Sequence, residues 1–221
     1  MNLSNEVHTR GGKWPIVLGI ISIILSILAV SFTGITAYKN LLKPFELAIR
    51  IDQAVQIQHK GNFGLYLNAD FFNKSPQNGL ITQLAVILYR TNSREDKYLL
   101  ELSSFRVLNE DNITYSYSQE KLPIFSQPWQ RNNKTMSFIY QREEGFPIST
   151  GTYICELLIW IDDSIKPKYV KEIKFEITTD VFNLYSERRK AGSVTLEPTN
   201  VVGYTPLKSK KLTDEEYKRL H

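Results

Sequence analysis

Cysteine and histidine are scarce in this 221-residue sequence, which contains one cysteine and three histidines. The single cysteine, Cys155, cannot form a disulfide within the chain, and its position inside an apolar run indicates a small buried side chain. The histidines, His8, His59 and His221, do not have the ligand spacing of a zinc or iron site. We therefore expect no bound metal and no other cofactor.

Catalytic motifs are also lacking. The chain has no glycine-rich phosphate loop and no nucleophile-elbow pattern. The acidic pairs Glu143-Glu144 and Asp162-Asp163 stand beside Gly, Pro or Ser, in contexts typical of solvated turns. We therefore expect no catalytic residues, and the sequence favours a protein that acts by binding rather than an enzyme.

Concentrated positive charge is missing from the central part of the chain. The net charge is +4, but residues 39–186 contain 17 basic and 17 acidic side chains, so the excess lies near the two ends. Binding to phosphates requires clustered lysine and arginine. We therefore do not expect a nucleic acid among the partners.

One long apolar run is present near the N-terminus, where residues 16–37 carry no charge. As a helix with a rise of about 1.5 Å per residue, this run reaches roughly 30 Å, the thickness of a bilayer core. Signal-peptide cores usually have about 7–15 apolar residues, and the small-residue cleavage site at 35–37 begins with an unsuitable isoleucine. Trp14 and Tyr38 flank the run, as aromatic residues do at membrane interfaces. We interpret residues 15–38 as one transmembrane helix in the lipid bilayer, with a cleaved signal peptide as the alternative.

Basic residues alone do not decide the orientation of this helix, because similar numbers stand on its two sides. The N-terminal side has Arg10 and Lys13, and the other side has Lys39, Lys43 and Arg50. A short tail before a single span, followed by a folded domain, is the usual layout of a signal anchor. We expect an N-terminal tail (1–14) in the cytoplasm and an extracytoplasmic C-terminal domain, periplasmic or at the cell surface.

Small residues recur along the apolar run at spacings of three and four, which places them on one stripe of a helix. Lipid tails give no hydrophobic drive for helices to associate, so small residues matter because they let two backbones approach closely. We expect this stripe to pack against a helix of another membrane protein. Its members are Gly19, Ser22, Ser26, Ala29, Thr33 and Thr36.

Beyond a juxtamembrane linker (39–50), apolar residues recur with a period of two, which is typical of β-strands. The stretches "GLYLNADFF", "LITQLAVILYR" and "YVKEIKFEIT" show this alternation, and turn-forming residues separate them. Seven or eight short strands with almost no helical pattern between them predict an all-β fold, an antiparallel β-sandwich over residues 51–180.

The stretch "STGTYIC" carries a resemblance to a known fold family. Tyr153 stands two residues before Cys155 and just after a glycine-containing corner. This resembles the tyrosine corner of immunoglobulin-like and fibronectin type III-like sandwiches, in which the tyrosine hydroxyl bonds back to the backbone. The chain departs from true immunoglobulin domains because it has no second cysteine and no tryptophan in the candidate C strand. The resemblance implies a sandwich and no particular ligand.

In such a sandwich the "AVILYR" strand lies beside the strand that contains Tyr153. If Tyr153 points inward, alternation turns several apolar neighbours to the outer face. An exposed apolar patch usually marks a contact site, and aromatic residues often dominate one. We expect partner binding through Ile87, Tyr89, Ile154, Leu158 and Trp160. The alternative is that the C-terminal tail or residues 41–50 fold back over this patch.

Residues 181–221 lose the strand pattern and are expected to form an extended basic tail that ends in a short helix. Thr213 and Glu216 form a capping box, and Leu212 and Tyr217 stand at the positions of a hydrophobic staple. A helix near 214–220 is too short to be stable alone. We expect it to dock on this domain or on a partner.

Together these features predict a non-enzymatic single-pass membrane protein, an accessory or scaffolding subunit whose β domain contacts other membrane-protein subunits. The alternative is a free-standing surface or periplasmic module that binds a ligand or an adhesion target.

Overall fold

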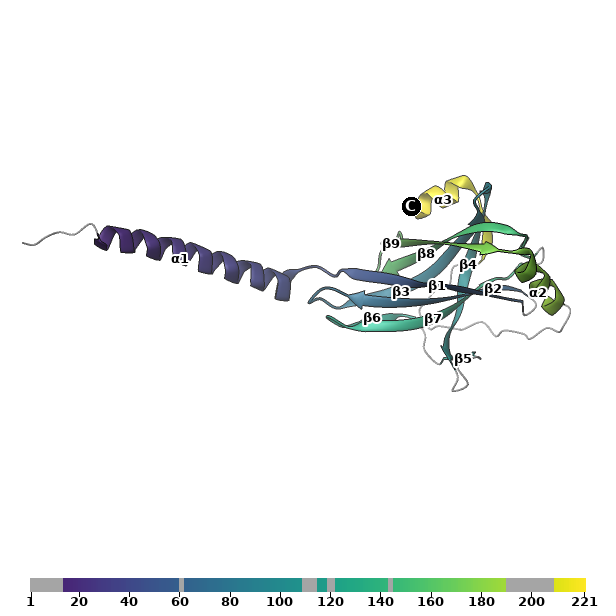
Figure 1. Ribbon diagram of the computed structural model, residues 1–221, viewed down its shortest axis with the longest axis horizontal. Coiled ribbons are helices and arrows are strands. Elements are labelled where there is room, and N and C mark those ends of the chain that lie inside the picture. Colours follow the sequence, from purple (N-terminus) through teal and green to yellow (C-terminus); the bar gives the residue numbers. More distant parts are fainter. Residues whose placement is uncertain (1–13, 60–61, 109–114, 119–121, 143–144, 190–208) are drawn as a thin grey trace, which may run out of the picture. The chain divides into compact units, whose positions relative to one another are not determined.

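The computed structural model describes residues 14–59, 62–108, 115–118, 122–142, 145–189 and 209–221 (Figure 1). The chain divides into two compact units, Met1–Lys43 and Pro44–His221.

The N-terminal unit is helical. Helix α1 spans Trp14–Ala37, and one π-helical turn, Tyr38–Leu42, extends it. Lys43 has an extended conformation, as expected for a residue that precedes a proline. The helix Ile16–Leu42 contains an 18-residue window with a mean hydropathy of 2.7 and is long and apolar enough to cross a membrane. Among the described residues, this is the one helix with those properties.

The described residues of the second unit are mostly β-strand, with two short helices. The strands are β1 (Leu47–His59), β2 (Phe63–Asn73), β3 (Gly79–Arg90), β4 (Ser93–Leu108), β5 (Tyr115–Tyr117), β6 (Ile124–Ser126), β7 (Arg131–Tyr140), β8 (Gly151–Ile161), β9 (Tyr169–Ile177) and β10 (Lys210–Leu212). The helices are α2 (Thr179–Arg189) and α3 (Asp214–Leu220).

The main strands form one antiparallel sheet in the order β1-β2-β7-β4-β3-β8-β9. Its two end strands contact each other, and the backbone N–H of Leu47 in β1 donates to the hydroxyl of Tyr169 in β9 over 2.9 Å. The sheet is therefore nearly closed. The predicted antiparallel β-rich domain is confirmed. The pair of separate sheets that defines an immunoglobulin-like sandwich is not confirmed, because the strands follow one continuous hydrogen-bonded path.

The main core lies on the inner side of this sheet. Alternate residues of β8 point into it, as the sequence predicts, namely Tyr153, Cys155, Leu157, Ile159 and Ile161. Cys155 is fully buried, and this burial raises the pKa of its thiol. The prediction of a buried structural cysteine is confirmed.

Tyr153 makes the backbone bond that the resemblance to a tyrosine corner implies. Its hydroxyl donates to the carbonyl oxygen of Ser149 and accepts from the backbone N–H of Ser149, both at 3.1 Å. This bond ties the segment before β8 to the core.

Two boundaries differ from the sequence-based expectation. Strand β1 begins at Leu47, inside the expected linker. Helix α2 occupies the start of the segment that we expected to be extended. Its Tyr185 is buried against the main core, with its ring centroid 6.2 Å from that of Phe63. The "TTDVF" stretch contains β-branched residues and little helical periodicity, so tertiary packing rather than local preference accounts for this helix.

Candidate functional site: a sheet face under a C-terminal strap

Strands β3, β4 and β8 also carry apolar side chains on the side opposite the main core. Register brings them together, because Tyr89 lies opposite Ile154 and Ala85 lies opposite Leu158. We call this second cluster the outer face. It consists of Ala85, Ile87, Tyr89, Leu99, Ile154, Leu158 and Trp160. The five residues predicted for partner binding all belong to it, so the predicted side of each side chain is confirmed.

The expectation that these five residues are exposed is wrong. Ile87 and Leu158 are fully buried, and the most accessible member, Tyr89, is 7% exposed. Residues 209–221, which we call the strap, lie over the outer face beside β4 (Figure 1). The strap contributes the apolar side chains Leu212, Tyr217 and Leu220. The alternative that the C-terminal tail folds back is therefore the arrangement found, and a role for Ile87, Tyr89, Ile154, Leu158 and Trp160 in partner binding stays a prediction.

Strand β10 of the strap adds to one edge of β4. Lys210 pairs with Leu99, and Leu212 pairs with Lys97. Strand β7 pairs with β4 only from Glu101 onward. Strand β10 therefore covers backbone groups that β7 leaves unpaired, and such an edge is a template for another strand.

Helix α3 follows the strand and begins with the predicted capping box. The Thr213 hydroxyl accepts from the Glu216 backbone N–H at 3.2 Å, and the Glu216 carboxylate accepts from the Thr213 N–H at 3.0 Å. The side chain of Lys210 also bonds to this carboxylate. The pKa of Glu216 is lowered to about 2. The bond from Lys210 is the largest cause, and the bond from the Thr213 backbone is the next.

A buried carboxylate lies between the strap and the sheet. Glu156 is 5% exposed, and its Oε1 accepts from the hydroxyls of Tyr89 at 2.8 Å and Tyr217 at 2.9 Å. His221 Nε2 lies 3.3 Å from Oε2, without hydrogen-bond geometry. Burial, followed by the bond to Glu156, raises the pKa of Tyr217 to about 12. Sequence reasoning missed this cluster, although an acid inside the apolar stretch "ICELLIW" is the pattern that could have revealed it.

Charged groups at the margin of the strap add little to its attachment. Lys97 Nζ lies 3.3 Å from the Asp214 carboxylate and 4.5 Å from the Tyr217 ring centroid, and Lys211 pairs with Asp96. The Lys97 side chain is mostly buried, but Asp214, Lys211 and Asp96 are solvent-exposed, and ion pairs that water can reach usually contribute about 0–1 kcal/mol. The strap is therefore held mainly by its apolar side chains, by the β10 backbone bonds and by the Tyr217–Glu156 bond.

The predicted helix-packing stripe lies along the exposed surface of α1. Three of its hydroxyls, those of Ser26, Thr33 and Thr36, donate at 2.8 Å to carbonyl oxygens four residues earlier. These polar groups are therefore satisfied inside the helix and do not oppose burial in an apolar medium. Packing of the stripe, Gly19, Ser22, Ser26, Ala29, Thr33 and Thr36, against another helix stays a prediction.

No protein-family model and no curated protein matches this sequence. A solved structure described as a protein from Archaeoglobus fulgidus aligns with 8% sequence identity and a TM-score of 0.34. The alignment covers 61% of this chain and 98% of that one. At this TM-score the likeness does not establish a shared fold.

Proposed function

We propose that this chain is a non-enzymatic single-pass membrane protein that works as an accessory or scaffolding subunit. Its N-terminal tail is cytoplasmic, helix α1 spans the bilayer, and the β domain is extracytoplasmic, with the strand alternation and tyrosine corner of an immunoglobulin-like module. The domain contacts other membrane-protein subunits.

The observation that carries this proposal is the outer face with its strap. The face buries seven apolar residues and one carboxylate beneath a strap whose described part is thirteen residues long. The site accepts an added strand at the edge of β4, apolar side chains above Leu158, and a hydroxyl donor to Glu156. A segment of another subunit with this chemistry could take the place of the strap by β-strand addition.

Helix α1 supports the same proposal. The helix has the length and composition of a membrane span, and three hydroxyls of the stripe, those of Ser26, Thr33 and Thr36, are bonded within the helix. Its small residues allow a neighbouring helix to approach closely, and these three hydroxyls stay paired when they are buried between the two helices.

Purification of the full-length protein from native membranes in mild detergent tests the proposal. We expect one or more membrane proteins to accompany it in a fixed stoichiometry, measured by native mass spectrometry. The double variant Ser22→Leu, Ser26→Leu should lose these partners because leucine keeps the two helix backbones apart. The control Ile23→Leu lies off the stripe and should retain them.

If the protein migrates without any other subunit in its detergent micelle, and the variants do the same, the subunit role is contradicted. It would favour the alternative, a free-standing ligand-binding or adhesion module. A cavity bordered by the Arg90 guanidinium is the one observation that favours that alternative.

A further inference from the structure

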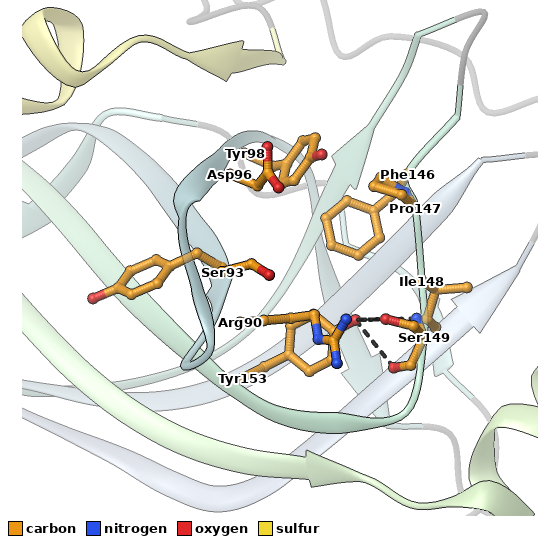
Figure 2. Close-up of a pocket in the computed structure, with 10 residues that line it drawn as sticks. Arg90, Ser93, Asp96, Tyr98, Phe146, Pro147, Ile148, Ser149 and Tyr153 are labelled. Atoms are coloured by element: carbon orange, nitrogen blue, oxygen red, sulfur yellow. Dashed lines mark hydrogen bonds between the residues drawn. The ribbon is translucent and has the colours of Figure 1, made fainter.

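A cavity of about 330 Å³ lies beside the strap, where β3 turns into β4. Its walls come from the adjoining ends of these two strands, the start of β8 and the segment 146–149. Figure 2 shows Asp96 and Tyr98 on one side, Arg90 and Tyr153 opposite them, and Phe146 and Pro147 on a third side. Ligand pockets in proteins have volumes of about 300–1,000 Å³. This cavity is therefore large enough for one small organic ligand.

The guanidinium of Arg90 provides a fixed positive charge in this cavity. Arg90 is the last residue of β3, opposite Tyr153 in the register. Its Nη2 donates to the carbonyl oxygen of Thr150 at 3.0 Å, which anchors the side chain. Its Nε is buried and has no hydrogen-bond acceptor among the described residues. A buried charged donor without an acceptor is costly, so a ligand oxygen bound to this guanidinium would offset that cost.

Aromatic rings form the apolar part of the cavity. Phe146 lies between two tyrosines, with its ring centroid 5.0 Å from that of Tyr98 and 6.4 Å from that of Tyr153. The Tyr153 hydroxyl is already bonded to the Ser149 backbone. Tyr153 is 1% exposed and belongs to the main core, so it supports the base of the cavity and offers no free donor. A planar aromatic group can pack against these rings in edge or offset contacts.

The charges around the cavity favour an anion. The one acid that lines it, Asp96, already pairs with Lys211 of the strap. Lys211 also lies 5.9 Å from the Tyr98 ring centroid, so it brings a second cation to the margin of the cavity. An ammonium group would therefore compete with Lys211 for Asp96, whereas a carboxylate would meet the Arg90 guanidinium directly. Arginine–carboxylate bonds are among the strongest hydrogen bonds in proteins.

We propose that this cavity binds the carboxylate of an N-acylated aromatic amino acid, either free or as the C-terminal residue of a peptide. The carboxylate accepts from the Arg90 guanidinium, and the aromatic group lies against Tyr98 and Phe146. The acylated nitrogen is neutral, so it does not compete with Lys211 for the Asp96 carboxylate. The site goes beyond the proposed subunit role and does not depend on it.

Calorimetric titration of the full-length protein in detergent tests this site, with N-acetyl-phenylalanine as the probe. We expect saturable binding, and binding at least about tenfold weaker for N-acetyl-phenylalaninamide, which lacks the charged oxygen. Arg90→Gln should weaken probe binding by at least about tenfold. Arg94→Gln should change it by less than about twofold, because Arg94 is an exposed residue of the same hairpin that does not line the cavity.

A thermal melt of each variant separates lost binding from lost folding. If Arg90→Gln does not fold, Phe146→Leu replaces it as the test and should weaken binding of the probe while the domain still melts cooperatively. Absence of saturable binding to the unmodified protein would overturn the proposal. Equal affinity for the acid and the amide, or equal losses for Arg90→Gln and Arg94→Gln, would also overturn it.

A peptide of three glycines and a C-terminal phenylalanine distinguishes the two sources of this chemistry. Binding at least as tight as that of N-acetyl-phenylalanine assigns the site to a peptide end. Clearly weaker binding assigns it to a free acylated amino acid. Either result supports the carboxylate site, provided that the same peptide with an amidated C-terminus does not bind.

Discussion

The two sides of β8 are shielded from solvent by different parts of the molecule. Leu157 points into the main core, which the nearly closed sheet encloses. Its neighbour Leu158 belongs to the outer face, which the strap covers. Both leucines are fully buried. The main core can reach water only if the sheet opens, but the outer face can reach water if thirteen residues detach. Equal burial therefore does not imply equal dependence on the fold, and the outer face is the side on which exchange with a partner costs less.

The largest expected effect comes from replacing these two leucines separately. Leu157→Ala should lower the free energy of unfolding by about 2–5 kcal/mol, as core truncations of leucine do. Leu158→Ala should lower it less, because the loss cannot exceed the free energy with which the strap is attached. Chemical denaturation of each full-length variant in detergent measures both values. Equal losses would show that the outer face is as integral to folding as the main core.

A smaller effect is expected from ending the chain after Lys208, which removes the strap and retains α2. The domain should still unfold cooperatively, with a loss of about 1–3 kcal/mol from the exposed apolar side chains, reduced by the ordering entropy that is no longer lost. Hydrogen exchange should become faster at Lys97 and Leu99, which pair with β10. Loss of the cooperative transition would contradict this. A cut after Thr179 is a poorer test because it also removes the buried Tyr185.

The smallest effect concerns acid pH. The pKa of Glu216 is lowered to about 2, chiefly by its bond with Lys210. A lowered pKa means that the stabilisation is present above the ordinary value of 4.5 and is lost as the pH falls from there towards 2. The protection of α3 amides from hydrogen exchange, taken relative to the intrinsic exchange rate at each pH, should therefore fall over this interval.

Glu216→Gln should remove this pH dependence, whereas Glu215→Gln, in the same turn, should preserve it. An unchanged acid profile in Glu216→Gln would show that another carboxylate controls the attachment of α3.

Local patterns were sufficient for several elements. Alternation in "TYICELLIWI" assigned Cys155 and Leu157 to one side and Leu158 and Trp160 to the other, because a strand has only two sides. Thr213 and Glu216 predicted the start of α3, because a capping box acts within one helical turn. The absence of charge in residues 16–37 predicted a helix of membrane-spanning length.

Other features depend on contacts between distant segments. Alternation is the same in a sandwich and in a nearly closed sheet, so the two are distinguished only by the continuous hydrogen-bonded path of the strands and the contact of β1 with β9. The cavity at Arg90 needs side chains from β3, β4 and the 146–149 segment, which no sequence spacing relates. Helix α2 forms where local preference is weak, because Tyr185 gains burial against the main core.

The sequence by itself determined which residues of this protein are apolar, which side of each strand they occupy, and where a membrane span and a capped helix can form, because all of these follow from local periodicity. Only the tertiary structure decided that the strap covers the outer face and that Glu156 becomes a buried acceptor for Tyr89 and Tyr217. The physical reason is that residues 209–221 can cover that face only after the sheet has brought β3, β4 and β8 side by side.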